Sequence, residues 1–445
     1  MEHTAARSLA AFAAGLRYDA IPALATERAR QCLIDAVGVC VLGSRLPWGK
    51  AVADYARHYG GPGTSRMIGS PHAVSAPLAA LANGVFAHGF ELDSLRKPGA
   101  GVHPGAALVP AALALGEEIG CSGRALLTAL VAGCEVMFRI GAATKHSSEQ
   151  LGFHASGLTG PFGAAVTVAS LLELDAERTT QALGIAGSLC GGLLAFAKAD
   201  NGAMVKRLHL GRAAEAGILA TRLAERGFEG PDTILEGGYG FLDTYCTQAD
   251  PALLTAELGM RFEIAKLCIK RYPCHVTAHT PLVAIEALRR EHGFGRDDVE
   301  SIVVRASAKV ASHHADREPT DTMAAQYSVP WCVAVGVRDD PMDPTAFGSR
   351  GLNDAGLRAL CRAVRCEAAS EGRGWASEVT LQLRDGRMLT RAEDDFPGTP
   401  TMPLTQDALR DKYRRCAGDF GAAERLLAQL EQIESIGNLR ELALA

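Results

Sequence analysis

The feature that most limits the possible folds is an alanine-rich helical pattern that runs from residue 5 to about residue 265. Apolar residues recur at helical spacing in one segment after another, and in ERARQCLIDAVGVCVLG the residues Ala29, Leu33 and Val37 fall on one helix face. Small residues often recur four positions apart, which allows helices to approach closely. Alternating strand patterns are almost absent here, so we expect a large domain of about eight helices.

Strand patterns are confined to a later part of the chain. The segment VESIVVRAS, residues 299–307, is rich in β-branched residues and partly alternating, which predicts a strand. Two alternating runs within residues 376–394 are joined by Asp385 and Gly386, a strong hairpin signal. A helix that ends at Gly293 leads into the first of these strands.

These patterns predict a mainly α protein with two domains. Residues 1–265 together with residues 404–445 are expected to form an all-helical domain. Residues 266–403 are expected to form a smaller α+β domain.

Composition argues against several classes of protein. A net charge of −5 is unsuited to a broad nucleic-acid surface, which needs a basic face. The 12 cysteines are widely spaced without a CxxC pair, as expected of reduced thiols in a cytoplasmic protein. The first residues lack the basic stretch of a signal peptide, and no uncharged apolar run is long enough to indicate a membrane span. We therefore expect a cytoplasmic protein with no nucleic-acid or membrane partner.

Motifs for metal, nucleotide and nucleophile sites are absent or incomplete. HExxH and EF-hand patterns are missing, and the adjacent His313 and His314 would point in different directions on a helix. The glycines of GLTGPFG, residues 157–163, are not preceded by the strand that a dinucleotide fingerprint requires, although a helix start can weakly hold an anion. No GxSxG elbow is present, and Cys274 beside His275 fits a structural thiol. We predict neither a metal nor a cofactor.

Five polar clusters interrupt the apolar sequence, and each lies near a glycine or proline. They are HGFELDS (88–94), GVHPGA (101–106), GFHASG (152–157), VKRLHLGRAA (205–214) and KRYPCHVTAH (270–279). Lysine and arginine bind carboxylates, histidine exchanges protons near neutral pH, and aspartate orients a histidine or acts as a base. A lone histidine is more often structural, but five similar clusters favour proton chemistry next to a carboxylate.

At these clusters the sequence resembles the MmgE/PrpD family, which includes 2-methylcitrate dehydratase, cis-aconitate decarboxylase and iminodisuccinate epimerase. The similar segments cover nearly the whole chain and follow the family's order. They are CLIDAVGVCVLGS, AHGFELDS with HPGA, GFHASGLTGPFGAAVTVASLLELD, KRLHLGRAAEAGILATRLAERGFEGPDTILEGGYGF, KRYPCHVTAH and AAQYSVPWCVAVGV. The resemblance implies a helical domain with an α+β lid, an active site in the cleft between them, and a homodimer that needs no metal.

The resemblance also implies the residues of the site. Carried over by motif, the pocket residues are Asp93, His103, His154, Lys206 and His275. We assign general acid and base catalysis to His103, with Asp93 orienting it or sharing the proton. His154 is expected to be a second proton donor or a carboxylate contact.

Substrate carboxylates are assigned to Lys206 and His275. Further substrate-binding candidates are Arg96, Lys97, Lys270 and Tyr327. The chain departs from the family pattern at Ser94, where many relatives have a second aspartate, and around Arg96 and Lys97, where the decarboxylases differ.

These assignments predict a metal-independent lyase that acts on a small di- or tricarboxylate through a carbanion- or enolate-like intermediate. Dehydration, as in 2-methylcitrate dehydratase, is the first hypothesis because it is the family's most familiar activity. Epimerisation of a dicarboxylate such as iminodisuccinate is the second, and decarboxylation of the cis-aconitate type is the third. A non-catalytic helical scaffold whose polar clusters cap helices is the alternative from a different class.

Overall fold

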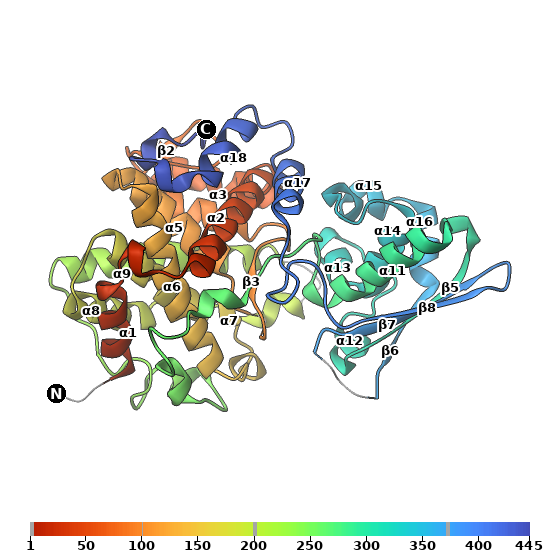
Figure 1. The fold of residues 1–445 in the computed structure, drawn as a ribbon, viewed down its shortest axis with the longest axis horizontal. Helices are drawn as coiled ribbons and strands as arrows, with labels where there is room; N and C mark the ends of the chain where they lie inside the picture. Colours follow the sequence, from red (N-terminus) through yellow and green to blue (C-terminus); the bar gives the residue numbers. More distant parts are fainter. Residues whose placement is uncertain (1–3, 100, 199–202, 371–373) are drawn as a thin grey trace. The chain divides into compact units, whose positions relative to one another are not determined.

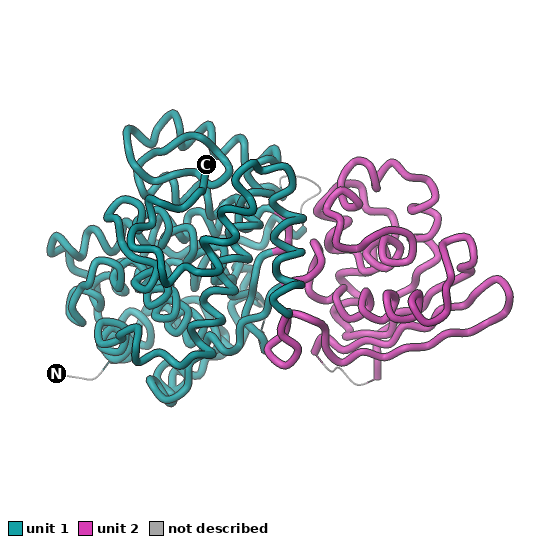
Figure 2. Tube along the Cα trace, turned by 45° about the horizontal axis from the view of Figure 1, so that its top comes forward, with its two compact units in different colours: residues 1–89, 93–269, 405–445 teal, residues 90–92, 270–404 magenta. Residues whose placement is uncertain are grey.

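The described residues of the chain divide into two compact units (Figure 2). The computed structural model describes residues 4–99, 101–198, 203–370 and 374–445. Unit 1 consists of Met1–Gly89, Asp93–Ile269 and Thr405–Ala445. Unit 2 consists of Phe90–Leu92 and Lys270–Leu404.

The short segment Phe90–Leu92 belongs to unit 2, although the segments on both sides of it belong to unit 1. Its attachment has a clear cause. The side-chain amide of Gln326 donates to the carbonyl of Phe90 at 2.8 Å, and the Lys270 ammonium donates to the carbonyl of Glu91 at 3.0 Å. The amino-acid pattern alone did not predict this excursion, because the bonds join positions far apart in the sequence.

Unit 1 is built almost entirely of helices, which confirms the predicted mainly α class (Figure 1). They are α1 (Ala5–Gly15), α2 (Ala23–Ser44), α3 (Pro47–Tyr59), α4 (Ala76–Ala87), α5 (Pro104–Ile119), α6 (Gly123–Ala143), α7 (Ala155–Leu171), α8 (Ala176–Gly187), α9 (Val205–Glu225), α10 (Phe241–Tyr245), α17 (Gln406–Ala417) and α18 (Ala423–Glu431). Ser122 caps α6 as its sequence indicates, since its side chain accepts the N–H of Ala125. The C-terminal helix α17 packs on α2 of the same unit.

The described residues of unit 1 also form four very short strands, which pair antiparallel in two ribbons. They are β1 (Ser65–Arg66), β2 (Ala73–Val74), β3 (Leu95–Arg96) and β4 (Leu267–Cys268). The pair β3–β4 matters for the site, because β3 lies between Asp93 and His103 in the sequence. Its pairing with β4 holds β3 in place. Two-residue strands leave no alternating pattern, which is why the sequence did not predict them.

Small residues set the spacing of the central helices. Helix α4 packs on α9 and helix α7 packs on both α6 and α9. A Cβ added to Gly211 of α9 would lie 2.4 Å from the Leu81 carbonyl oxygen of α4, and one added to Gly160 of α7 would lie 2.7 Å from the Cβ of Ala213. The glycines of GLTGPFG therefore serve helix packing inside α7 and do not form a phosphate loop.

Helix α6 has the length and hydropathy of a membrane-crossing helix, with a mean hydropathy of 1.6 in its most apolar window. The sequence did not indicate this helix as a membrane span, because it contains the charged residues Glu135 and Arg139. In the structure, 83% of that window is buried inside the protein. Burial among other helices thus accounts for its apolar composition.

Unit 2 holds a four-stranded sheet in the order β6-β5-β7-β8. The strands are β5 (Val299–Ala306), β6 (Val364–Ala368), β7 (Ser377–Leu383) and β8 (Met388–Glu393). The helices are α11 (His279–His292), α12 (Ala308–His313), α13 (Thr322–Tyr327), α14 (Val329–Arg338), α15 (Ser349–Leu352) and α16 (Ala355–Arg362). Helix α11 contacts β7 and β8, and α14 contacts β6 (Figure 1).

The predicted strand and hairpin of this unit are confirmed. Strands β7 and β8 pair antiparallel around Gly386, which has φ +91°, and α11 is followed by its C-cap Gly293, which has φ +63°. Strand β6 was not predicted. It pairs parallel with β5 at the edge of the sheet, and only Val364 among its residues is buried, so it carries little apolar signal.

The contact between α4 and α9 generates the first prediction. Gly211→Ala places a methyl group against the α4 backbone, so it should lower the free energy of unfolding by about 1–3 kcal/mol, the usual cost of overpacking a core. Urea unfolding measures the change. Gly15→Ala at the end of α1 is the matched control, because no atom lies within 4 Å of the added Cβ. Equal stability of the two variants would contradict the packing argument.

Candidate active site

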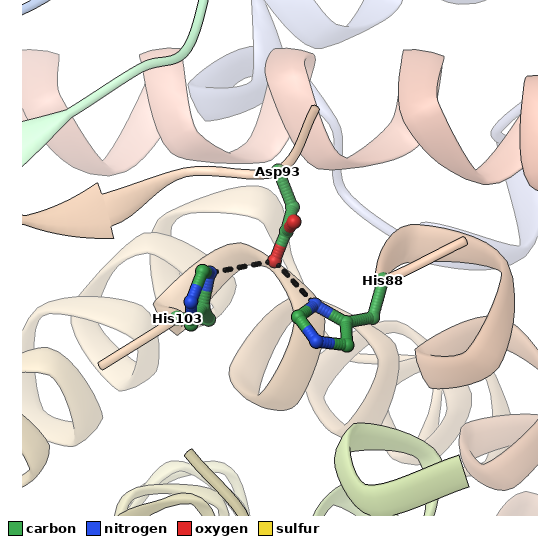
Figure 3. Close-up of side chains that lie close together, drawn as sticks. All are labelled: His88, Asp93 and His103. Carbon is green, nitrogen blue, oxygen red and sulfur yellow. Dashed lines mark hydrogen bonds and ion pairs between the residues drawn. The ribbon is translucent and has the colours of Figure 1, made fainter. Parts of the chain in front are cut away.

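The centre of the candidate site is a buried carboxylate that lies between two histidines (Figure 3). His88 follows the last residue of α4, Asp93 precedes β3, and His103 is the N-cap of α5. The Oδ2 atom of Asp93 lies 2.9 Å from Nδ1 of His88 and 2.9 Å from Nδ1 of His103. Asp93 and His88 are fully enclosed, and the His103 side chain is 10% exposed.

The hydrogen-bond pattern determines where the protons of both rings lie. Nδ1 of His103 faces two acceptors, the Asp93 carboxylate and the Ser94 carbonyl at 3.1 Å, so this nitrogen carries the proton. The Nε2 atom of His103 is therefore the nitrogen available for proton exchange. His88 likewise donates through Nδ1, and its Nε2 has no hydrogen-bond partner among the described residues.

Burial and hydrogen bonding act in opposite directions on Asp93. Burial raises the pKa of its carboxyl, but the two imidazole N–H donors outweigh burial and hold the pKa well below its usual range. Burial also lowers the pKa of His88 well below its usual value, and the Lys206 ammonium acts in the same direction. Asp93 is thus a carboxylate beside a neutral His88.

Three further polar residues complete the unit 1 histidine cluster, which we define as His88, Asp93, His103, His154, Lys206 and His209. The ring of His154, the N-cap of α7, lies 5.9 Å from that of His88 between centroids. Its Nδ1 lies 3.0 Å from Nδ1 of His209 on α9. Lys206 on the same helix is buried, and its charge lowers the pKa of His209 after the larger effect of burial.

The pair His154 and His209 connects the side chains around Asp93 with a cavity. Burial lowers the pKa of His154 to about 3, and His209 and His103 reinforce this shift while Asp93 opposes it. His209 also lines a cavity of about 460 Å³ whose other walls include Pro161 and Phe196. Both histidines are neutral near pH 7, so one donates and the other accepts the hydrogen bond between them.

Arg96 and Lys97 are less directly placed for substrate binding. The Arg96 guanidinium is buried and donates to Glu263 at 3.0 Å and to the carbonyl of Pro98, so it holds the β3 segment in place. Lys97 is half-buried, and its backbone N–H donates to the carbonyl of Lys266 at 2.9 Å. The structure thus brings Asp93, His103, His154 and Lys206 together, while Arg96 is committed to another carboxylate.

The remaining predicted residues meet in unit 2. We define the unit 2 polar cluster as Glu91, Lys270, His275, His314 and Tyr327. The Lys270 ammonium donates to the Glu91 carboxylate at 3.1 Å, and the Tyr327 hydroxyl donates to the other oxygen of Glu91 at 3.4 Å. The ring of His275 lies 4.9 Å from that of Tyr327 and 4.4 Å from that of His314, between centroids.

Four members of these two clusters were not predicted from the sequence, namely His88, Glu91, His209 and His314. His88, Glu91 and His209 lie within the polar motifs quoted above, but motif resemblance selected only one or two residues from each motif. His314 is adjacent to His313, and in the sequence this pair suggested only a metal motif. Its burial beside His275 depends on the end of α12 and leaves no trace in the local pattern.

The atoms of His88, Asp93 and His103 are close enough to suggest a metal site, since one ligand atom from each lies within 4.8 Å of the others. The geometry fits a hydrogen-bonded triad better. Both histidines direct the proton-bearing Nδ1 toward Asp93, so neither of these nitrogens offers a lone pair to a metal. The arrangement is that of a histidine oriented by a carboxylate, which suits acid and base catalysis.

Comparison with known proteins identifies the family of the chain. The MmgE/PrpD N-terminal domain model matches residues 7–254, and the MmgE/PrpD C-terminal domain model matches residues 272–436. The chain therefore belongs to the MmgE/PrpD family.

Several individual relatives are similar over most of their length. Cis-aconitate decarboxylase of Mus musculus is 27% identical, with 96% of this chain and 90% of that protein covered. The enzyme of the same name from Aspergillus terreus is 28% identical, with 97% and 94% covered. That of Homo sapiens is 26% identical, with 95% and 90% covered. The family and these relatives support an enzyme of the lyase class.

The low pKa of His154 generates the second prediction. Between about pH 6.5 and pH 3 the unfolded chain binds a proton at His154 that the folded chain does not, so stability falls as the pH falls through this window. His154→Gln should remove up to about 1.4 kcal/mol per pH unit from the slope of unfolding free energy against pH.

Urea unfolding at pH 7, 6 and 5 measures this slope. His72→Gln, which replaces an exposed imidazole of the same unit, is the matched control and should follow the wild type. Parallel slopes for wild type and His154→Gln would show that His154 is not held neutral by burial.

Proposed function

We propose that the protein is a metal-independent lyase that acts on a small tri- or dicarboxylate, and that decarboxylation of an unsaturated tricarboxylate of the cis-aconitate type is its reaction. The hydrogen bond between Asp93 and His103 is the observation that carries this proposal. The names of the similar proteins support the choice of decarboxylation over the dehydration that the sequence analysis placed first.

The pair Asp93 and His103 supplies the proton chemistry. With Nδ1–H bonded to the carboxylate, the ring accepts or donates a proton through Nε2, and the Asp93 charge stabilises the imidazolium that forms. His103 retains some exposure to solvent, so water can return a proton to it after each turnover. A buried and ionised Asp93 is the feature that keeps this ring in one tautomer.

Decarboxylation requires one protonation. The bond between the carboxylate and its carbon breaks, carbon dioxide leaves, and the electron pair remains on the carbon skeleton, where a neighbouring carboxylate and double bond delocalise it. Nε2–H of the His103 imidazolium then protonates the carbon. Lys206, buried in the same cluster, lowers the cost of the negative charge that develops.

Carboxylate recognition in this proposal falls to Lys206 and His275. Lys270 has a different role, because its ammonium is already bound to the Glu91 side chain and backbone. We therefore assign Lys270 and Tyr327 to holding Glu91, and we assign Arg96 to positioning through Glu263.

Dehydration is the second candidate, and a specific observation favours it. Loss of a β-hydroxyl needs one group to remove a proton and another to protonate the leaving oxygen. The unit 1 histidine cluster offers two rings for this purpose, His103 and His154, and each has its Nδ1 hydrogen-bonded.

Product analysis tests the proposal and separates the candidates. The purified protein is incubated with cis-aconitate, 2-methylcitrate and iminodisuccinate, in water and in D₂O. Release of carbon dioxide from cis-aconitate supports decarboxylation, and loss of water from 2-methylcitrate supports dehydration. Deuterium incorporation at the α-carbon without loss of carbon dioxide or water would indicate epimerisation. No change in any substrate would reject the proposal.

The third prediction concerns the proton donor. Because positioned proton transfer contributes about 100- to 10,000-fold, His103→Ala should lower kcat at least about 100-fold while the protein stays folded. The steady-state rate on the substrate identified above is the measurement, with circular dichroism as the check on folding. His72→Ala removes an exposed histidine from the same unit and should retain wild-type turnover. Retention of activity by His103→Ala would disprove the assignment.

A further inference from the structure

His314 is a buried histidine whose ring is not accounted for by the fold. The residue is 5% exposed, and neither ring nitrogen has a hydrogen-bond partner among the described residues. The backbone carbonyl of Tyr327 acts to raise the pKa of the ring, which is a smaller effect than the lowering by burial. Buried polar side chains are nearly always hydrogen-bonded, so a ring in this state points to a missing partner.

The neighbouring His313 shows that burial without a hydrogen-bond partner does not follow from the local sequence. His313 is exposed, and its Nδ1 lies 2.7 Å from the hydroxyl of Ser312. Helix α12 ends at His313, and the next residue turns its ring inward. The two adjacent histidines therefore differ in burial and in hydrogen bonding.

The position of His314 is fixed by contacts with two other segments of unit 2. Its carbonyl accepts the N–H of Val329, the first residue of α14, at 2.8 Å. Its ring stacks on that of His275 with an interplanar angle of 28°. His275 is held in turn by its backbone N–H, which donates to the carbonyl of Gln326 at 2.8 Å. These bonds make the stacked pair a built feature of the unit.

The protons of the stacked pair suit an anionic partner. Nδ1 of His275 accepts the backbone N–H of Thr277, which leaves the proton of the ring on Nε2. Burial lowers the pKa of His314 to about 4, and Lys309 and His313 act in the same direction, so this ring is neutral near pH 7 and offers one N–H donor. Two N–H donors on stacked rings can meet the two oxygens of one carboxylate.

We propose that His314 is a specificity-determining residue, which together with His275 binds one carboxylate of the substrate. The inference rests on the proposed function, because a small polycarboxylate is the ligand that it names. His314 would discriminate between acids that carry this carboxylate and acids that lack it. Water on the ring nitrogens is the competing explanation.

Binding of two unreactive probes by isothermal titration calorimetry tests the inference. Wild type should bind propane-1,2,3-tricarboxylate more tightly than glutarate, which lacks one carboxylate. His314→Phe keeps an aromatic ring against His275 but removes both nitrogens. It should weaken tricarboxylate binding by about 10- to 100-fold, the loss of one charge-assisted hydrogen bond, and should leave glutarate binding nearly unchanged.

The matched control is His313→Gln on the exposed neighbour, compared with His314→Gln. Only the latter should raise KM for the identified substrate, with a smaller effect on kcat, since the residue is not assigned to proton transfer. Equal effects of the two substitutions, or unchanged tricarboxylate binding in His314→Phe, would overturn the inference and leave the proposed function standing. Failure of wild type to bind either probe or to transform any substrate would instead reject the proposed function.

A crystal structure of the wild-type protein with propane-1,2,3-tricarboxylate gives a test that needs no variant. A carboxylate oxygen within hydrogen-bond distance of a His314 ring nitrogen is the expected result. A bound probe with only water at those nitrogens would overturn the inference.

Discussion

A single buried carboxylate oxygen organises the candidate site of unit 1. The Oδ2 atom of Asp93 accepts hydrogen bonds from His88 and His103, which come from the end of α4 and the start of α5. A buried carboxylate is costly unless it is bonded, so its presence requires both rings to stay where they are. The same bonds select the tautomer of His103 and leave its Nε2 for proton exchange. Removing one ring would leave the buried charge with only one of these two hydrogen bonds.

A second buried carboxylate, that of Glu91, binds side chains of unit 2. Glu91 is two residues from Asp93 in the sequence, yet it is bound by Lys270 and Tyr327 and belongs to the other unit. Glu91 itself has a positive φ of 54°, a conformation that non-glycine residues seldom adopt. Glu91 and Asp93 thus belong to two different polar clusters, although one short loop holds both. The helices on either side, by contrast, are held mainly by apolar contact and by close packing at glycine.

Charged residues in the motifs differ in the surroundings that the structure gives them. Lys206 is buried in the unit 1 histidine cluster, where its charge adds to the larger effect of burial in lowering the pKa values of His88 and His209. Arg96 and Lys270 are also cations of the sequence motifs. Arg96 is bound to Glu263, and Lys270 is bound to Glu91. Resemblance to a family selects types of residue without telling which carboxylate each cation contacts.

The sequence by itself determined the mainly α class, the helical periodicity, the Ser122 cap, the Gly293 stop and the β7–β8 hairpin, because these depend on residues within a few positions of one another. It also indicated the motifs that hold the chemistry. Tertiary structure alone decided which residues of each motif meet, as in the contact of His154 with His209, 55 positions apart. It likewise buried His314 and exposed His313. Such outcomes depend on the packing of distant segments, and no local pattern encodes them.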